Sequence, residues 1–144
     1  LTSSTSDDSI FGGSGDDTID GNQGRDFLAG GAGADRFDFD DSVFADGAVY
    51  AGVGKGNRDR IVDFVGEEGD RINLAGIDAD RATVLVNEAI VFVGEKAPGT
   101  GELGYIESGG STIVRGNTDD DAAPEFEIQL DGLGLGLTAD DFLL

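Results

Sequence analysis

Three consecutive nine-residue units between residues 12 and 38 constrain the fold of this chain more than any other feature of its sequence. They read GGSGDDTID, GNQGRDFLA and GGAGADRFD, with no gap between them. Each unit has glycine at its first and fourth places, aspartate at its sixth place and an apolar residue at its eighth place. A degenerate unit at residues 3–11 keeps the last two features. The shared aspartates are Asp8, Asp17, Asp26 and Asp35, and the shared apolar residues are Ile10, Ile19, Leu28 and Phe37.

The register of these units predicts a flattened coil of stacked turns and strands, and a cation bound between the turns. The first six residues of each unit predict a turn, because glycine adopts positive φ without the steric cost of a Cβ atom. The last three predict a short strand whose central apolar side chain points inward. Successive strands then lie on alternating sides of a flattened coil, so each turn stacks on the turn two units later. Carboxylates stacked in this way repel one another unless a cation lies between them, and turn carbonyls without a strand partner need the same ion. Ca²⁺ suits such a site because it accepts about six to eight oxygens in flexible geometry.

At these residues the sequence resembles the RTX family, whose calcium-binding nonapeptide is G-G-x-G-x-D-x-U-x. Units 12–20 and 30–38 match it in full, and unit 21–29 departs only at Asn22. The resemblance implies an all-β fold, a right-handed parallel β-roll capped by antiparallel strands, with one calcium ion between each pair of turns on the same edge. A flexible Gly/Asp-rich linker has a similar composition. The apolar residues in register at the eighth places argue against a linker.

The resemblance also implies one set of calcium ligands on each edge of the roll. Carbonyls and carboxylates from two units would form each set. The first set is Gly13, Gly15 and Asp17 with Gly30, Ala32 and Asp35. The second set is Ser4, Ser6 and Asp8 with Gly21, Gln23 and Asp26. In the second set, residues 3–6 lack the glycines that the turn prefers.

The rest of the chain predicts further strands and no long helix. Expected strands cover residues 36–40, where the chain leaves the roll, two short stretches within 59–74, and residues 84–86 and 89–93. Residues 103–107 and 111–115 have hairpin spacing, and Thr138 can cap a last short turn. In residues 125–130 the alternation places Phe126, Ile128 and Leu130 on one face and leaves Glu127 on the other, as a surplus surface acid.

Residues after the repeats resemble the C-terminal domain of serralysin-type secreted metalloproteases. The matching stretches are residues 59–64, 69–74, 126–132 and 137–144. The resemblance implies a single module over residues 1–144, with the roll at 3–40 and a β-rich cap at 41–144 that ends in a type I secretion signal. It also implies that Asp59 and Asp63 help to close the last turn around an additional calcium ion, although both also fit ordinary exposed charge. Residues 117–121 depart from the family pattern, so we place no ion there.

Composition excludes several classes of function. Thirty acidic residues against nine basic ones give a net charge of −21, which excludes nucleic acid and anionic membranes as partners. The chain has no cysteine for a disulfide and no histidine for an H-E-x-x-H zinc site or a histidine-based triad. No apolar run of about eighteen residues predicts a membrane span. The module is therefore expected to bind calcium and not to be an enzyme itself.

Two functions remain as the main hypotheses. The first is a calcium-folded module of a larger extracellular protein, secreted by a type I machinery. The alternative is a polysaccharide-binding module that resembles the R-modules of alginate epimerases, which share the repeats. A polyanionic chain would need a basic stripe, whereas the basic residues here are outnumbered throughout. A calcium-dependent surface adhesin is a third possibility.

Overall fold

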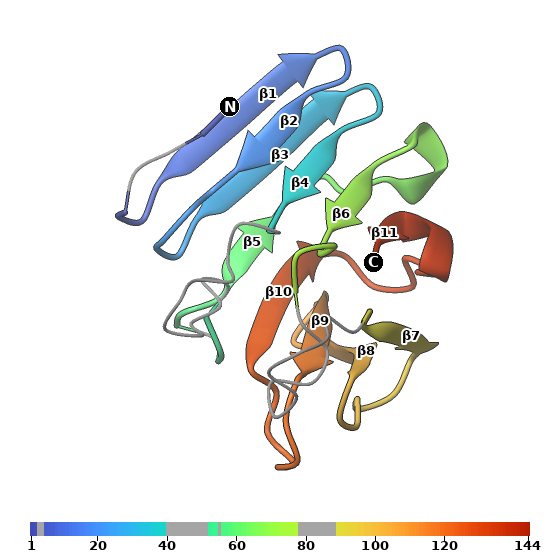
Figure 1. The fold of residues 1–144 in the computed structure, drawn as a ribbon. Coiled ribbons are helices and arrows are strands. Elements are labelled where there is room, and N and C mark those ends of the chain that lie inside the picture. The colour runs from blue at the N-terminus through green and yellow to red at the C-terminus, as the bar shows by residue number, and fades with distance from the viewer. Residues whose placement is uncertain (3–4, 40–51, 55, 78–88) are drawn as a thin grey trace.

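Two β-sheets make up the part of the chain that the computed structural model describes, residues 1–2, 5–39, 52–54, 56–77 and 89–144 (Figure 1). One sheet has seven strands in the order β1-β3-β5-β10-β9-β8-β7, and the other has four in the order β11-β6-β4-β2. Helical structure in the described residues is limited to two short 3₁₀ turns, η2 (Gly66–Glu68) and η3 (Ala139–Asp141). The strand expected at residues 84–86 and the predicted ligand Ser4 lie outside the described residues.

The repeats form the predicted coil. Strands β1 (Ser9–Ser14) and β3 (Phe27–Ala32) pair in parallel in the larger sheet, while β2 (Thr18–Asp20) and β4 (Arg36–Asp38) pair in parallel in the smaller sheet. Consecutive units therefore alternate between the sheets. The eighth-place residues point between the sheets, and Ile19, Leu28 and Phe37 are fully buried. This part of the fold confirms the register that the sequence predicts.

Two strands of the roll are longer than the repeat pattern predicts. β1 and β3 continue through the first three residues of the next unit, where Gly13 pairs with Gly31 and Ser14 pairs with Ala32. The prediction that these residues belong only to turns is wrong on this side of the roll. Units that stack two apart keep the same register, so their backbones continue the parallel ladder until the chain turns toward the other sheet.

Parallel stacking also continues past residue 40, where we expected the roll to end. β5 (Asp59–Ile61) lies beside β3, and β6 (Arg71–Asn73) lies beside β4, so β4 is an inner strand of its sheet and does not leave the roll. Ile61 and Ile72 extend the column of fully buried side chains. The short strand β11 (Phe142–Leu143) then pairs in parallel with β6.

The sequence shows why the stacking continues. Residues 54–62 read GKGNRDRIV and residues 65–73 read VGEEGDRIN. Both stretches keep aspartate at the sixth place and isoleucine at the eighth, although their glycines are displaced from the family pattern. The two stretches are therefore further degenerate units of the same repeat.

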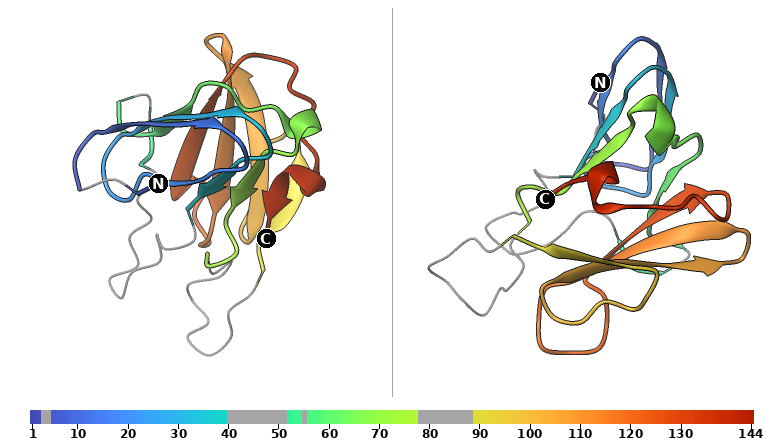
Figure 2. Two further views of the ribbon diagram at one scale, coloured as in Figure 1. Left: turned by 90° about the horizontal axis from the view of Figure 1, so that it is seen from above. Right: turned by 90° about the vertical axis from the view of Figure 1, so that its right-hand side faces the viewer.

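Antiparallel strands lie beyond β5 in the larger sheet (Figure 2). β8 (Glu102–Ser108) and β9 (Ser111–Asn117) form the predicted hairpin, and β10 (Phe126–Asp131) pairs antiparallel with β9 and parallel with β5. β7 (Val91–Gly94) pairs with β8 in parallel. Thr138 caps η3, as predicted, by accepting a hydrogen bond from the Asp140 N–H. Among the described residues, no helix has the length and hydropathy needed to cross a membrane.

Glu127 in β10 is not the surface acid that the alternation predicted. Its residue is 2% exposed, although Phe126, Ile128 and Leu130 do point into the core as expected. The Glu127 carboxylate accepts hydrogen bonds from Arg115 Nε and from the Gly54 N–H, each at 2.7 Å. It also lies 3.4 Å from the Arg58 guanidinium. At Glu127 the second face of β10 is thus covered by charged partners and a turn, and not by solvent.

Candidate metal centres at the edges of the roll

Sixth-place aspartates form a ladder along the first edge of the roll. The Asp17 N–H donates to Asp35 Oδ1 at 2.9 Å, and the Asp35 N–H donates to Asp70 Oδ1 at 3.0 Å. Asp70 Oδ2 also accepts from the Val65 N–H at 2.8 Å. Each carboxylate thus binds the backbone of the turn stacked before it. The ladder brings the predicted pair Asp17 and Asp35 together and adds Asp70.

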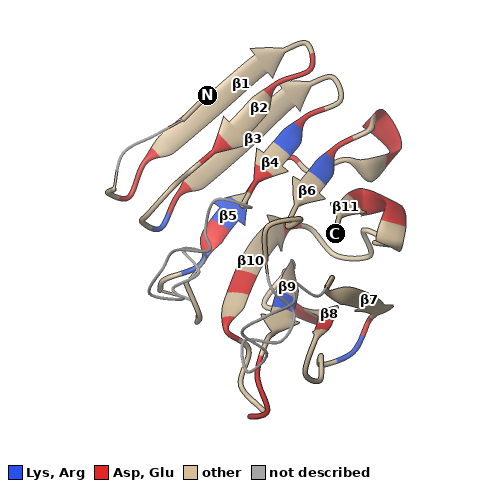
Figure 3. Cartoon of the chain, viewed as in Figure 1, with Lys and Arg blue, Asp and Glu red and all other residues tan. Residues whose placement is uncertain are grey.

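The second edge repeats the arrangement with the alternate units. The Asp8 N–H donates to Asp26 Oδ1 at 2.8 Å, and the Asp26 N–H donates to Asp59 Oδ1 at 2.7 Å. Asp26 and Asp59 are each 1% exposed, so Asp59 does not have the exposed strand charge that we considered for it. The predicted pair Asp8 and Asp26 therefore meets here, and Asp59 extends it. Figure 3 shows acidic residues gathered at the turns on both edges.

The second oxygen of three ladder carboxylates is the strongest evidence for a cation. Oδ2 of Asp17, of Asp26 and of Asp35 is buried without a hydrogen-bond partner among the described residues. A buried anionic oxygen without a donor costs several kcal/mol by order of magnitude, so it needs a counter-ion or a proton. Hard oxygen donors of this kind fit Ca²⁺.

The first glycine of each unit makes room for this oxygen. A Cβ atom on Gly12 would lie 2.8 Å from Asp17 Oδ2, and Cβ atoms on Gly21 and Gly30 would collide with Oδ2 of Asp26 and of Asp35. Each aspartate carboxylate therefore packs against the first glycine of its own unit. The first glycine is required by this contact and not by its own backbone angles.

The predicted carbonyl ligands lie in the same turns. Cβ atoms on Gly31 and Gly33 would collide with the carbonyls of Gly13 and Gly15, so these turns stack with their backbones in direct contact. The Ala32 carbonyl already accepts a hydrogen bond from the Gly15 N–H at 2.8 Å. The prediction that the turn carbonyls have no backbone partner is wrong for Ala32, whose oxygen still has a second lone pair.

Two other turn positions follow the repeat despite changes in sequence. Asn22 has φ of 56° and so occupies the left-handed region in place of the glycine expected there. Asparagine tolerates this conformation better than most residues, so the departure at the second place of unit 21–29 preserves the turn. On the second edge, a Cβ atom on Gly24 would lie 2.5 Å from the Ser6 carbonyl, so the predicted ligand Ser6 stacks on the turn that contains Gln23.

Burial and crowding also raise the pKa of carboxylates on the second edge. Loss of hydration, together with the nearby Asp26 carboxylate, raises the pKa of Asp59 to about 7. Burial, together with the carboxylates of Asp8, Asp7 and Asp20, raises the pKa of Asp26 to about 6. Burial raises the pKa of Asp70 on the first edge. A cation at these positions would hold the carboxylates in their charged form at neutral pH.

Asp63 does not join Asp59 at one turn. Asp59 begins β5 and Asp63 lies two residues beyond its end, where the Asp63 carboxylate accepts hydrogen bonds from the N–H groups of Gly30 at 3.0 Å and Gly31 at 2.9 Å. Asp59 instead binds the Asp26 N–H. The expected role of both residues around an additional calcium ion stays a prediction.

Sequence reasoning passed over a further cluster of acids between β9 and β10. Ligand atoms of Asp119, Asp121 and Glu125 all lie within 4.8 Å of one another. The loop curls because the Asp119 N–H donates to Asn117 Oδ1 at 3.1 Å and the Asp121 N–H donates to Asp119 Oδ1 at 2.9 Å. The spacing of Asp119 and Asp121, two residues apart, was the sequence signal that could have indicated this cluster. Our prediction that residues 117–121 hold no ion stays a prediction.

Comparisons with known proteins agree with this geometry. Residues 2–37 match the family model of the RTX calcium-binding nonapeptide repeat in four copies, so the resemblance seen in the repeats is confirmed there. No curated protein matches the sequence significantly.

Two solved structures share the fold. The AlgE6R3 subunit of the Azotobacter vinelandii mannuronan C5-epimerase is 24% identical with a TM-score of 0.55, and covers 98% of this chain and 80% of that one. The AlgE6R2 subunit of the same epimerase is 23% identical with a TM-score of 0.58, and covers 100% of this chain and 91% of that one. Residues 2–37 thus carry calcium-binding repeats, and the chain as a whole has the fold of these R subunits.

Proposed function

We propose that residues 1–144 form a single calcium-folded module of a larger extracellular protein that leaves the cell by type I secretion. Three buried carboxylate oxygens, on Asp17, Asp26 and Asp35, have no hydrogen-bond partner within the described part of the chain, and they carry the calcium-folding part of this proposal. The calcium ions would be held by carbonyls and carboxylates of stacked turns. On the first edge these are Gly13, Gly15, Asp17, Gly30, Ala32 and Asp35, and on the second they are Ser4, Ser6, Asp8, Gly21, Gln23 and Asp26.

The mechanism follows from the charge of these turns. Without a cation, the stacked carboxylates repel one another and the glycine-rich backbone loses about 1–2 kcal/mol of entropy per residue on folding. The few buried side chains of the roll do not offset both terms. Calcium that binds only the native turns adds its binding free energy to the folding free energy. The chain would stay loose where calcium is scarce and fold where it is abundant, which favours export in one direction.

The remaining strands have a place in this proposal. β10 pairs with β5, the last roll strand of the larger sheet, and β9 and β8 follow it. In this proposal these antiparallel strands are the cap of a roll that is right-handed. The terminal residues 141–144 would act as the secretion signal. In the folded chain they include β11, which is paired with β6.

Far-UV circular dichroism during calcium titration, followed by addition of a chelator, tests the proposal. We expect a cooperative gain of β-structure with calcium and its loss with chelator. Replacing Asp17 with asparagine should raise the calcium concentration at the midpoint, whereas Glu95→Gln, an exposed acid outside the roll, should not. Equal spectra with and without calcium would contradict the proposal.

A second candidate function is polysaccharide binding. The fold of the R subunits of a mannuronan C5-epimerase supports this candidate, although at this identity the likeness concerns the fold alone. Three of the nine basic residues, Arg25, Arg58 and Arg60, also gather at one cleft. Titration with alginate in the presence of calcium tests whether the module binds an acidic polysaccharide. A saturable, salt-sensitive binding signal would support this candidate.

A further inference from the structure

A cleft of about 390 Å³ opens on the outer face of the larger sheet, where β1, β3, β5 and β10 lie next to one another. Phe27, Arg60 and Gln129 are cross-strand neighbours in one row of this face. Their chain neighbours Leu28, Ile61 and Leu130 point the other way, into the core. The row therefore faces outward, with the turn residues of the second edge beside it.

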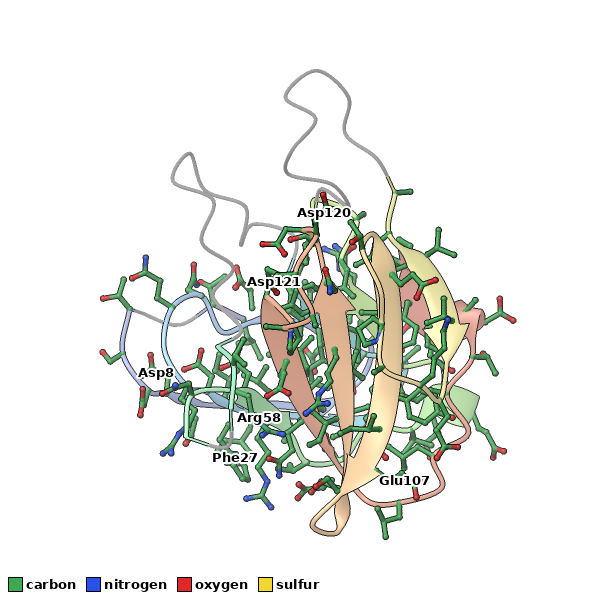
Figure 4. All side chains as sticks on the ribbon, turned by 90° about the horizontal axis from the view of Figure 1, so that it is seen from below. Asp8, Phe27, Arg58, Glu107, Asp120 and Asp121 are labelled. Atoms are coloured by element: carbon green, nitrogen blue, oxygen red, sulfur yellow. The ribbon has the colours of Figure 1, made fainter. Side chains whose placement is uncertain are left out.

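An aromatic platform forms one wall of this region. The rings of Phe11 and Phe27 have centroids 6.0 Å apart, and Phe11 is 65% exposed. The Arg60 guanidinium lies over the Phe27 ring, 5.6 Å from its centroid. The two rings are tilted by 48° to each other, so the apolar surface that is open to a ligand is mainly the Phe11 ring, supported by Phe27. Figure 4 shows Phe27 close to Arg58 and Asp8, and away from Asp120, Asp121 and Glu107.

Polar groups beside the platform are already matched in charge. Arg60 donates two hydrogen bonds to Asp131, from Nε at 2.8 Å and from a terminal nitrogen at 2.6 Å, and this pairing holds the pKa of Asp131 below its ordinary value. Arg25 lies 3.8 Å from Asp7, and Arg58 lies 3.4 Å from Glu127. Gln129 adds an amide that can donate and accept. The cleft thus offers donors and acceptors at short range but little free positive charge.

We infer that this cleft and its Phe11–Phe27 platform bind an uncharged polysaccharide. The inference rests on the second candidate function and names its site and its class of ligand. Arg60 already lies over the Phe27 ring, so the exposed Phe11 ring that packs against Phe27 is the one that suits the apolar C–H face of a hexose. The hydroxyl rim of a hexose, which both donates and accepts, suits paired Arg60 and Asp131 together with Gln129. A net charge of −21 repels a polyanion, and the arginines that would attract one are paired.

The test is isothermal titration of the calcium-loaded chain with five neutral oligosaccharides, namely the hexaoses of the cello-, manno-, xylo-, laminari- and malto- series, and with alginate. We expect saturable binding of at least one neutral hexaose that changes little with added salt. Phe27→Ala should weaken that binding by about tenfold. Phe27→Leu, which keeps an apolar side chain but removes the ring, should weaken it while preserving the fold. Val91→Ala, an exposed apolar position in β7 of the same sheet, is the matched control and should bind normally.

The outcomes separate this inference from calcium-coupled folding. If none of the five neutral hexaoses bound to a chain that still folds with calcium, the inference would be overturned, and the proposal of a calcium-folded module would stand. Binding of alginate alone would overturn it in favour of a charged ligand. Neutral binding that survives Phe27→Leu unchanged would place the ligand elsewhere and also overturn it. Failure to fold with calcium would instead contradict the first proposed function.

Discussion

The roll and the antiparallel strands treat buried acids in opposite ways. In the roll, Asp35 is 1% exposed and its Oδ2 has no hydrogen-bond partner among the described residues. In β10, Glu127 is 2% exposed, and its two oxygens accept from Arg115 and from the Gly54 N–H, with Arg58 nearby. The antiparallel strands supply their own counter-ions, whereas the roll leaves a place for an ion from solution.

Repetition explains the difference. Each turn of the roll stacks on a turn with the same pattern, so an aspartate at one place faces the aspartate two units later and no arginine can be placed opposite it. β9 and β10 have unrelated sequences, and Glu127 is the direct cross-strand partner of Arg115. A repeated architecture therefore brings like charges together, and a non-repeated one can pair opposite charges. This comparison predicts that calcium controls the roll far more than the antiparallel strands.

Calcium removal should have the largest effect and is the most direct way to break the comparison. After chelation, backbone amides of β1–β4 should lose their protection from hydrogen exchange, because the stacked carboxylates then repel one another. Amides of β8–β10, which depend on ordinary ladders and buried side chains, should lose protection later or less. Hydrogen exchange followed by mass spectrometry measures both regions in one sample. If β8–β10 and β1–β4 lost protection together, the two regions would be a single calcium-dependent unit.

Truncation of Glu127 should have the next largest effect. Glu127→Ala leaves Arg115 and Arg58 without their buried partner, and we expect it to lower the free energy of unfolding by about 3–5 kcal/mol. Because the counter-ions here belong to the protein, the loss measured by urea unfolding should be the same at intermediate and at saturating calcium. Glu95→Gln is the exposed control. A loss that disappears at saturating calcium would mean that Glu127 acts through the metal sites.

A methyl group at the first glycine of a unit should have a smaller effect that depends on calcium. In Gly30→Ala the new Cβ collides with Asp35 Oδ2, so the variant should lose about 1–3 kcal/mol and require more calcium to fold. Gly99→Ala is the matched control, because its Cβ would meet Glu102 Oε2 at an ordinary 3.5 Å. Calcium titration followed by circular dichroism compares the two variants. Equal midpoints would show that Asp35 does not need its present position to bind the ion.

Proton competition should give the smallest effect and sharpens the comparison within the roll. The folded-state pKa values of Asp26, about 6, and Asp59, about 7, exceed the ordinary 3.8. The calcium-free fold therefore takes up protons, and its stability falls as pH rises from about 4 through 7, while calcium binding releases those protons. Far-UV circular dichroism in the absence of calcium should therefore show β-structure that is retained at pH of about 4 and lost as the pH rises through about 7.

The variant Asp59→Asn is the control for this pH dependence. It removes the carboxyl whose pKa is raised to about 7, so most of the loss of calcium-free structure with rising pH should disappear. The Arg60–Asp131 pair should not contribute, because the pKa of Asp131 is lowered and the carboxylate stays charged over this range. A pH dependence that survives Asp59→Asn unchanged would assign it to other groups.

The repeats could be predicted from the sequence because their pattern is local. The register alone identifies Ile19, Leu28 and Phe37 as one buried column and pairs Asp17 with Asp35. Ile61 and Ile72 extend that column, but their units have displaced glycines, so a search guided by glycine ends at residue 38. Aspartate and isoleucine two places apart were the better signal, since these residues face the ladder and the core.

The surroundings of Glu127 could not be predicted in the same way. Alternation in β10 shows which face holds Phe126, but it does not show what covers the other face. That cover comes from Gly54, 73 residues away in the sequence, and from Arg58 in the same turn. A contact of this kind depends on β10 pairing with β5, which no local pattern indicates. The convergence of acids in the loop at residues 117–125 was not predicted for a different reason, because a family pattern was applied there and the spacing of the acids was not used.

The alternation of consecutive units between the two sheets limits how such a chain can change in length. Hydrogen bonds along each edge join residues 18 positions apart, as from Asp17 to Asp35. Duplicating or deleting 18 residues would add or remove one full circuit and leave every later strand in its own sheet. Insertion of a single nonapeptide would move β5, and β10 with it, to the opposite side. Growth by gene duplication should therefore proceed in pairs of units.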